Sequence, residues 1–385
     1  MNDHFDHIVI GTGSMGAATC YYLAKRGYRV LGIDQFPTPH EWGSHGGQSR
    51  IIRKAYFEHP DYIPLLKRAY QNWAELEKAT GANIYFPTGL AYAGPQDDEM
   101  LKGVKASASQ YDVALTSGNE KGLQQQWPQF ELPAGYETLF EPEAGFIRPA
   151  TAIRSFLQEA KRYGAELLPE AKVAHWKYEA DKVMVHTDKG DYSCKKLVVT
   201  AGAWSSRLIP GIQELLKVTR QVLVWVDPPD RSRFEVGKFP CWLIATPDQP
   251  GAYYGFPIPE ERYADGPHYL KIAYHYGGEV TNPDEVNRVI TDADTEPILS
   301  FLKKYIPDAV GPIAAAKVCL YEYSPDEHFV IDNLPGYEDR VCVAWGFSGH
   351  GFKFASAIGE IMADLATNGT TPWPIGFLNA RRLMG

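Results

Sequence analysis

The sequence predicts an α/β protein, α+β in part, in which a Rossmann-type domain is joined to a second domain built on a mixed or antiparallel sheet. The chain opens with a strand, a glycine-rich turn, a helix and a second strand, a unit typical of doubly wound sheets. Residues 218–226 and 238–276 are rich in Tyr, Trp and Val with Pro and Gly between them, which indicates the second sheet. The 385 residues favour two domains, because single cores usually stop growing at roughly 250 to 300 residues.

The N-terminal unit has every part of a dinucleotide-binding fingerprint. Residues 5–10 read as an apolar strand that leads into the turn GTGSMG at 11–16. A helical stretch ends near Gly27, and residues 28–34 read as the next strand. A glycine turn that binds nothing is the simpler alternative, but the complete context favours a dinucleotide.

Each glycine of this fingerprint, and its acidic residue, has a physical role. Gly11 makes the tight turn, Gly13 lets the backbone approach a pyrophosphate, and Gly16 lets helix and strand pack closely. The helix N-terminus then faces the phosphates. Asp34, 23 residues after Gly11, can accept hydrogen bonds from a ribose diol and would repel a 2′-phosphate, so NADP is disfavoured.

The remaining segments extend this organisation along the chain. Residues 86–145 are irregular, and residues 196–204 read as a buried strand that returns to the first sheet beneath the ligand. The other expected elements are a helix at 151–164, strands at 166–173, 182–187 and 341–344, and a helix at about 352–366. We therefore expect a discontinuous dinucleotide-binding domain (1–85, 146–215 and 320–385) and a substrate domain (86–145 and 216–319).

Composition and charge exclude several classes of function. A net charge of −9 and a pI near 5.7 argue against nucleic acid or an anionic membrane as the main partner. No apolar run approaches 18 residues, and the N-terminus enters a strand without a basic and apolar leader, so we expect a cytoplasmic protein. The five cysteines are scattered without a CxxC pair, which predicts neither a disulfide framework nor a metal site.

Three clusters carry residues suited to chemistry. The first, residues 43–53, ends in Arg50 and Arg53, which would share one face if Arg50 opened a helix. Such arginines can stabilise a reduced, anionic flavin or clamp a carboxylate, although they can equally face solvent. The second is the strand at Cys319 with the glycine-rich turn 346–353, whose backbone N–H groups suit negative charge. A lone cysteine in a strand is most often packing material.

The third cluster lies in a strand-like segment. Lys271, Ala273 and His275 project to the same side of an extended strand. A lysine on an otherwise apolar strand needs a partner or a role, unless it sits at a solvated edge.

Together these segments resemble the family of monomeric sarcosine oxidase and N-methyltryptophan oxidase, flavoenzymes related to glycine oxidase and D-amino acid oxidase. The resemblance runs nearly end to end. Its most specific pieces are GTGSMG, GSHGGQSRIIRKAY, YYGFP, VCLYEYSPDEHF and GFSGHGFKFA.

The resemblance implies roles for individual residues. Cys319 matches the cysteine that bonds covalently to the 8α-methyl of FAD, and Lys271 matches the lysine that activates dioxygen. Arg53 and Lys353 match the pair that grips the substrate carboxylate, and Arg50 matches the arginine near the flavin ring. Pocket positions fall on Tyr254, His275 and Tyr321. Residues expected to bind FAD are Gly11, Gly13, Ser14, Met15, Gly16, Asp34, Gln35, Ser44, Ser49, Arg50, Val173, Gly202, Trp204, Gly346, Gly349, His350, Gly351 and Lys353.

The chain also departs from the family pattern. Relatives often read Ser-His-His-Gly-Asp-Thr-Arg where residues 44–50 read Ser-His-Gly-Gly-Gln-Ser-Arg, so a histidine and an aspartate are lost. The segment 257–270 is longer than expected for sarcosine oxidase and falls beside the pocket. The altered loop bears on the charge balance near the flavin, and substrate identity is not carried over from any one relative.

The resemblance implies a flavin-dependent oxidase of a small N-substituted amino acid, with Lys271, Arg50 and His275 as catalytic residues and dioxygen as acceptor. The imine product would hydrolyse to an aldehyde or keto acid plus amine, with hydrogen peroxide formed. The family expectation is a monomer. Two alternatives stay open: a dehydrogenase of the same fold that passes electrons to a carrier, and a flavin-binding protein without turnover. A nicotinamide dehydrogenase would leave Cys319 and the turn 346–353 without a role.

Overall fold

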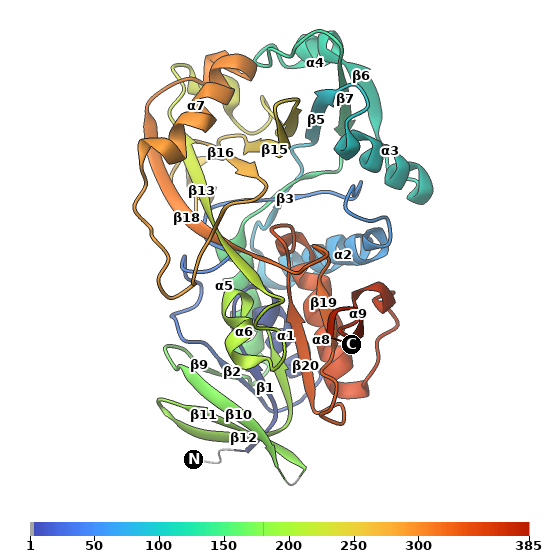
Figure 1. Ribbon diagram of the computed structural model, residues 1–385, viewed down its shortest axis with the longest axis vertical. Helices are drawn as coiled ribbons and strands as arrows, with labels where there is room; N and C mark the ends of the chain where they lie inside the picture. Colours follow the sequence, from blue (N-terminus) through green and yellow to red (C-terminus); the bar gives the residue numbers. More distant parts are fainter. Residues whose placement is uncertain (1–3, 180, 385) are drawn as a thin grey trace.

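The first sheet forms around two long parallel neighbours, β1 (His4–Ile10) and β12 (Gly190–Val199), in the lower half of Figure 1. The computed structural model describes residues 4–179 and 181–384, and in them this sheet has 8 strands. β1 also pairs in parallel with β2 (Val30–Ile33), and the apolar run Ile8 to Ile10 is buried. The strand–turn–helix–strand prediction is therefore confirmed, with β2 shorter than expected.

The other strands of this sheet join at its two sides. β2 pairs in parallel with β9, and the C-terminal half of β12 pairs in parallel with β20. β10, β11 and β19 add antiparallel neighbours. Their bounds are β9 Glu166–Leu168, β10 Val173–Glu179, β11 Lys182–Thr187, β19 Val330–Asn333 and β20 Val341–Trp345.

Two helices from opposite ends of the sequence pack against each other beside this sheet. α1 (Ser14–Lys25) and α8 (Ala355–Asn368) come close because small residues line their contact. A Cβ on Gly359 would lie 2.3 Å from the Cβ of Ala18, which is far inside van der Waals contact. The glycine turn at the start of the chain and the turn before α8 are thereby brought together.

Replacing Gly359 with alanine is expected to destabilise the fold. The added methyl group must push α8 away from α1, and overpacking of this kind costs about 1 to 3 kcal/mol. Urea unfolding of the variant checks the value. Gly376→Ala is the matched control, because a Cβ there meets nothing within 4 Å. Equal stability of both variants would contradict the close packing.

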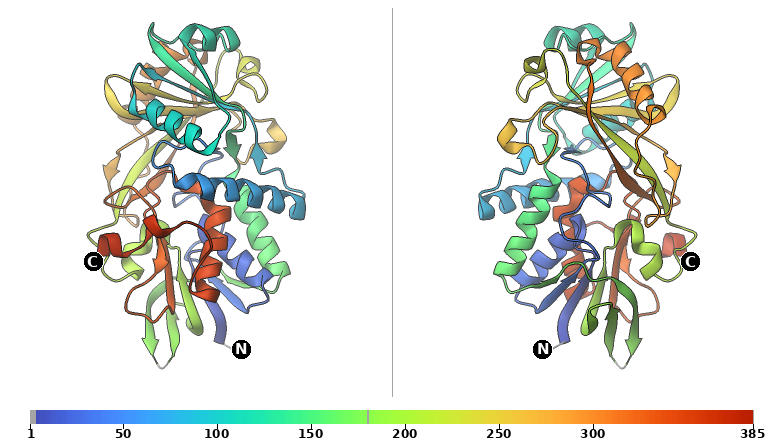
Figure 2. Two further views of the ribbon diagram at one scale, coloured as in Figure 1. Left: turned by 90° about the vertical axis from the view of Figure 1, so that its right-hand side faces the viewer. Right: turned by 90° about the vertical axis from the view of Figure 1, so that its left-hand side faces the viewer.

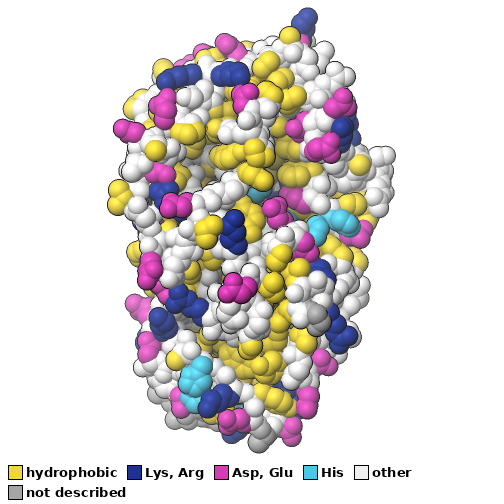
Figure 3. Space-filling view, viewed as in Figure 1, with side chains coloured by type: hydrophobic (Ala, Val, Ile, Leu, Met, Phe, Trp, Pro, Cys, Tyr) yellow, Lys and Arg dark blue, Asp and Glu magenta, His cyan; other side chains and the backbone are white. Residues whose placement is uncertain are grey.

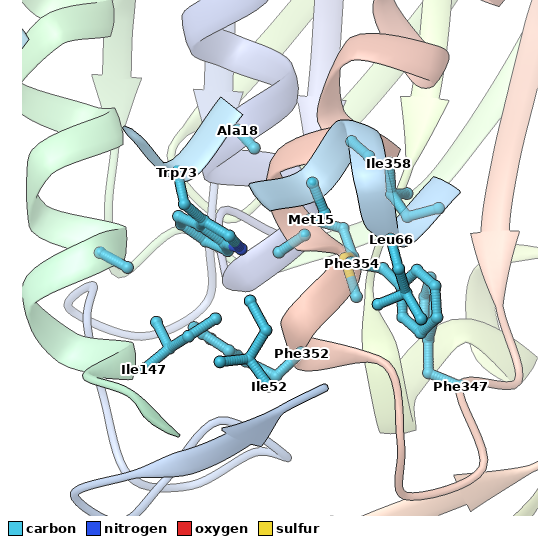
Figure 4. Close-up of a cluster of buried hydrophobic side chains, with 14 of the residues drawn as sticks. Met15, Ala18, Ile52, Leu66, Trp73, Ile147, Phe347, Phe352, Phe354 and Ile358 are labelled. Atoms are coloured by element: carbon cyan, nitrogen blue, oxygen red, sulfur yellow. The ribbon is translucent and has the colours of Figure 1, made fainter. Parts of the chain in front are cut away.

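A hydrophobic core fills the space between these helices and the middle of the molecule (Figure 4). α2 (Tyr62–Thr80) and α5 (Pro149–Arg162) complete it, and Trp73 of α2 is among its largest fully buried side chains. Trp73 donates its indole N–H to the carbonyl of Lys353 at 3.0 Å. This bond ties the core to the turn before α8. Labelled members in Figure 4 are Met15, Ala18, Ile52, Leu66, Trp73, Ile147, Phe347, Phe352, Phe354 and Ile358.

The second sheet, of 9 strands in the described chain, occupies the upper half of Figure 1 and is mixed, as predicted. Its longest pairing joins β13 (Lys217–Val226) to β18 (Ile313–Tyr323) in antiparallel register. The expected domain boundary between residues 319 and 320 falls inside β18, so the strand favours a boundary after Tyr323. The other strands are β5 Leu90–Pro95, β6 Thr116–Asn119, β7 Tyr136–Glu141, β14 Cys241–Thr246, β15 Gln249–Phe256, β16 Leu270–His275 and β17 Glu279–Val280.

A small third sheet corrects one expectation. Arg50 does not open a helix: β3 (Arg50–Ile52) pairs with β8 (Gly145–Ile147), which also pairs with β4 (Tyr85–Phe86). Ile51 and Ile52, the β-branched pair that follows Arg50, favour a strand over a helix. Arg53 lies just beyond the end of β3. The two arginines are therefore not neighbours on a helical face.

The two halves stack along the long axis, with β3, α2 and the lower ends of β13 and β18 between them (Figures 1 and 2). The remaining helices and 3-10 turns are α3 Glu99–Tyr111, α4 Glu120–Gln126, α6 Ser205–Leu208, α7 Asp292–Tyr305, α9 Arg381–Met384, η1 Gly202–Trp204, η2 Arg231–Phe234, η3 Glu261–Tyr263, η4 Pro307–Ala309, η5 Phe352–Phe354 and η6 Gly376–Leu378. No described helix is both long and apolar enough to span a bilayer. Basic and acidic side chains are interspersed over the face shown in Figure 3.

The segment 257–270 packs away from the main cavity. Asp265 accepts hydrogen bonds from Arg148 at 2.8 Å and from Thr151 at 2.7 Å, which fixes the segment to the start of α5. No residue of 257–270 lines the main cavity described below, so its extra length does not shape the walls directly.

Candidate functional site

One cavity of about 370 Å³ is lined by residues of both sheets and of the loops between them. Most of the predicted site residues meet there. Those that line it are Gly11, Gly13, Ser14, Met15, Asp34, Gln35, Ser44, Arg50, Arg53, Val173, Gly202, Trp204, Tyr254, His275, Tyr321, Gly349, His350, Gly351 and Lys353. The predicted residues that lie outside this lining are Gly16, Ser49, Lys271, Cys319 and Gly346.

The glycine turn at the start of α1 forms one end of the cavity. Gly11 has φ +87°, and a Cβ on Gly16 would lie 1.8 Å from the Gly11 carbonyl, so a side chain at Gly16 would displace the turn. Asp34 accepts a hydrogen bond from the Thr12 backbone N–H at 2.7 Å, which holds the turn against the end of β2. Gly13 precedes α1, and no side chain caps that helix end. Its free backbone N–H groups suit a phosphate.

Unpartnered polar atoms are buried beside this turn. Ser44 Oγ and His45 Nε2 make no hydrogen bond to any described residue. Burial lowers the pKa of His45 to about 3, with His40 and Arg50 adding to the effect, so its ring is neutral. Buried polar atoms are rarely left unpaired, so these two fit a site that receives a polar ligand. The glycine cradle and these atoms together fit a bound dinucleotide.

The loop from Ser44 to Ser49 wraps around Arg50. The guanidinium donates to the Ser49 carbonyl at 2.9 Å and to the Ser44 carbonyl at 2.8 Å. A further bond runs to the Gly46 carbonyl. These neutral acceptors leave the charge of Arg50 uncompensated, and Arg50 lines the cavity. The loop therefore presents a fixed positive charge to any ligand there.

Lys271 is buried behind this loop. Only 1% of it is exposed, and its Nζ donates to the Ser49 carbonyl at 2.7 Å. The ammonium lies 4.6 Å from the ring centre of Phe256. Burial, with Arg50 adding repulsion, lowers the pKa of Lys271 well below its usual value. The prediction that Lys271 and His275 share one side of a strand fits β16, whose bounds include both.

Cys319 lies in the middle of β18, opposite Gln221 of β13. Its thiol is 1% exposed, and burial raises its pKa. Arg50, Lys271 and Arg288 act in the opposite direction by favouring a thiolate. Cys319 is thus close enough to Arg50 and Lys271 for both side chains to act on the charge of its thiol.

Arg53 is held in a buried ion pair that sequence reasoning missed. Its Nη2 lies 2.6 and 2.8 Å from the two carboxylate oxygens of Glu58, and its Nη1 donates to the Ala55 carbonyl at 2.8 Å. Burial opposes ionisation of Glu58, but Arg53, His350 and Lys353 outweigh it and lower the pKa of Glu58 to about 2. Glu58 follows Arg53 by five residues, a spacing that carries no recognised motif.

Lys353 lies near this pair, in the turn before α8. Its Nζ donates to the His350 carbonyl at 2.7 Å and lies 5.2 Å from the ring centre of Tyr56. Burial and the charge of Arg53 lower the pKa of Lys353 to about 7, against the attraction of Glu58. The wall of the cavity therefore carries the guanidinium of Arg53 and the amine of Lys353, which is protonated below about pH 7, with the Glu58 carboxylate paired to Arg53.

Three pocket side chains predicted from the sequence contact one another. The Nδ1 of His275 lies 3.2 Å from the hydroxyl oxygen of Tyr321, and Tyr321 also interacts with Tyr254. Burial lowers the pKa of His275 to about 4, so its imidazole is neutral near pH 7. Phe57 and Leu243 also line the cavity and were not predicted. They carry no polar group that sequence reasoning could have singled out.

The comparisons with known proteins assign this fold and cavity to a class of oxidoreductases. Residues 6–365 match the family model described as "FAD dependent oxidoreductase". The chain belongs to this family.

Among curated proteins, the chain is similar to monomeric sarcosine oxidase of Streptomyces avermitilis, with 38% identity over 100% of this chain and 99% of that one. It is also similar to N-methyl-L-tryptophan oxidase of Yersinia pestis, with 35% identity over 98% of this chain and 99% of that one. The resemblance predicted from the motifs is confirmed.

Solved structures share the fold at lower identity. NikD, an unusual amino acid oxidase essential for nikkomycin biosynthesis, superposes with a TM-score of 0.86 at 22% identity, over 98% of both chains. Glycine oxidase from Geobacillus kaustophilus superposes with a TM-score of 0.81 at 18% identity, over 100% of both. The predicted α/β fold with a Rossmann-type domain is confirmed.

Proposed function

We propose that this protein is an FAD-dependent oxidase of a small N-methyl or cyclic amino acid. The observation that carries the proposal is the arrangement within one cavity: a dinucleotide-binding turn at one end, and the cations Arg53 and Lys353 beside neutral pocket side chains further along. A carboxylate needs such cations, and an amine about to lose hydrogen needs a site without a fixed negative partner. The names of the relatives, sarcosine oxidase and N-methyl-L-tryptophan oxidase, support the same substrate class.

Arg53 and Lys353 bind the substrate carboxylate in this proposal. Both are buried, so water screens their charges weakly, and an anion is attracted despite the net charge of −9. For Arg53 the carboxylate competes with Glu58, which already accepts from the same guanidinium. Binding therefore requires Arg53 either to share its donors or to turn from Glu58 toward the ligand.

His275, Tyr254 and Tyr321 orient and size the rest of the substrate. His275 is neutral, so it offers a hydrogen bond to the amine region without adding a charge there. The tyrosine rings and Leu243 form the wall that limits side-chain size. The substrate amine enters in its neutral form, with a C–H bond presented toward the cofactor.

FAD would be held by the turn at Gly11 to Gly16, by Asp34, and by backbone groups of the turn 346–353, and it supplies the two-electron acceptor. Cys319 would form the covalent link to the flavin, since Arg50, Lys271 and Arg288 favour its thiolate. Lys271 would serve the reaction with dioxygen in its protonated form, by placing a positive charge where oxygen gains an electron. Products are hydrogen peroxide and an imine that water hydrolyses to aldehyde or keto acid plus amine.

The deciding experiment is acid precipitation of the purified protein followed by an oxygen-electrode assay. We expect yellow colour and an added FAD mass to stay with the pellet, to leave it in Cys319→Ala, and oxygen to be consumed with N-methyl amino acids. Cys241→Ala is the matched control, because that thiol is also buried in the second sheet but is hydrogen-bonded to Thr88 and lacks the Arg50 and Arg288 charges that act on Cys319. Colour in the supernatant would refute the covalent link alone.

The same assay separates the alternatives. Substrate-dependent bleaching of the flavin without oxygen uptake would identify a dehydrogenase that uses a carrier. Flavin that no amino acid bleaches would identify a binding protein without turnover. A colourless protein that takes up no FAD would refute the proposed function.

Carboxylate binding is expected to weaken as the pH rises through about 7. Lys353 is a cation below its pKa of about 7 and neutral above it, so its attraction for an anion is present at about pH 6 and is lost at higher pH. Loss of one charged hydrogen bond corresponds to about tenfold in Kd. Titration with acetate, followed by flavin absorbance, measures the change. In Lys353→Met this dependence should disappear, and its persistence would contradict the assignment.

A further inference from the structure

Glu322 is a buried carboxyl group in the cavity wall that no step above uses. It lies in β18, one residue after Tyr321, and lines the cavity with only 3% of its surface exposed. Its Oε2 has no hydrogen-bond partner among the described residues. A buried, unpaired carboxyl oxygen is costly, so its retention at a ligand site calls for a function.

The side chain is fixed between β18 and the glycine-rich turn that precedes α8. On the main chain, Ser348 donates its backbone N–H to the backbone carbonyl of Glu322 at 2.8 Å. A Cβ on Gly346 would lie 2.9 Å from the Cβ of Ser324, and one on Gly349 would lie 2.4 Å from the Tyr321 ring. The turn thus fits closely around the end of β18. Its Gly346 and Phe347 N–H groups donate to the Glu322 carboxyl.

Charged groups on the surrounding elements are engaged elsewhere. Arg220 of β13 is paired with Asp294, and Arg382 binds Asp326 in the loop after β18. Arg207 of α6 is paired with Asp284. In the turn, Lys353 donates to the His350 backbone carbonyl, and the His350 ring is hydrogen-bonded to Tyr56. Burial therefore dominates at Glu322 and raises its pKa to about 8, opposed only by the two backbone donors.

We propose that Glu322 is a charge-compensating residue of the flavin site, which takes up a proton from solvent when the bound flavin becomes negatively charged on reduction. The proposal rests on FAD occupying this cavity, and not on which amine is oxidised. In the balanced step a reductant supplies two electrons, one proton goes to the flavin and a second goes to the Glu322 carboxylate. The buried site then carries the charge of the reduced flavin but not that of a Glu322 carboxylate as well. Repulsion between these two negative charges would oppose reduction.

The proposal predicts a specific dependence of the flavin midpoint potential on pH. Below about pH 7 Glu322 is already protonated, so wild type and Glu322→Gln should have equal potentials. Above about pH 8 the wild-type carboxylate must take up a proton on reduction, so its potential should fall more steeply with pH than that of Glu322→Gln. Glu159→Gln is the control, since Glu159 is buried in α5 but does not line the cavity.

The measurement is a redox titration of the FAD-loaded protein with dithionite and reference dyes at several pH values. A merely structural Glu322 would leave the two curves parallel, and that result would overturn the proposal. If Glu322→Gln does not retain flavin, reduction-induced infrared difference spectra of the wild type decide instead. A new C=O band of a protonated carboxylic acid above about pH 8 supports proton uptake, and its absence overturns it. Retained flavin in a substrate-inactive protein would refute the proposed function without touching this test.

Discussion

Arg53→Met is expected to lower kcat/KM for an N-methyl amino acid by about 10²- to 10³-fold. The variant loses a charged hydrogen bond to the substrate carboxylate. It also leaves Glu58, whose pKa is about 2 beside Arg53, as a buried carboxylate without its ion-pair partner. The remaining Glu58 charge repels the incoming anion, so the effect exceeds that of removing one contact.

The double variant Arg53→Met/Glu58→Gln separates these two causes. If repulsion contributes, kcat/KM should recover about tenfold relative to Arg53→Met alone, because the uncompensated carboxylate is gone. Steady-state kinetics and flavin content of both variants make the comparison. Unchanged kcat/KM in Arg53→Met with full flavin content would exclude Arg53 from carboxylate binding.

Lys271→Met is expected to slow the reaction of the reduced flavin with oxygen by about 10²- to 10³-fold while largely sparing flavin reduction by substrate. Methionine preserves the packing of the stem between Phe256 and Trp225 but removes the charge. Only the oxygen step gains from a cation, because there a neutral molecule acquires negative charge. Stopped-flow measurement of the two half-reactions tests the prediction separately for each.

Lys217→Met provides the control for this experiment. Lys217 also lies on the second sheet, in β13, but its side chain is exposed and does not line the cavity. Comparable slowing of both half-reactions in Lys271→Met would refute the assignment. Slow oxidation in both lysine variants would indicate a general effect of charge.

The sequence predicted the structure best where the backbone conformation of a turn restricts which residues can occupy it. Gly11, Gly16 and Asp34 predicted the turn, because its φ values and close contacts allow few other residue types at these positions. The Cys319 strand and the turn 346–353 were read from the sequence pattern, while the roles of their residues came from resemblance to a family; residues of both segments line the same cavity. Their roles remain predictions.

Other features depended on contacts that sequence spacing does not encode. A shared face for Arg50 and Arg53 depended on Arg50 opening a helix, but pairing of β3 with β8, far along the chain, makes Arg50 the first residue of a strand. Glu58 and Glu322 were not predicted, because the role of Glu58 depends on its pairing with Arg53 and that of Glu322 on burial, and only the folded chain supplies both. The expected domain boundary between residues 319 and 320 falls inside β18, because the strand continues to Tyr323 without any turn residue.

The order of segments along the chain has a consequence for biosynthesis. β20 and the turn before α8 span residues 341–353, yet they complete the sheet and the cavity that begin with β1 and the first glycine turn. During translation the N-terminal unit therefore leaves the ribosome long before its last partner strand is made. The proposed FAD site is therefore complete only after residues 341–353 have been made, and a nascent chain stalled before residue 341 would have the fingerprint turn without the rest of the cavity wall.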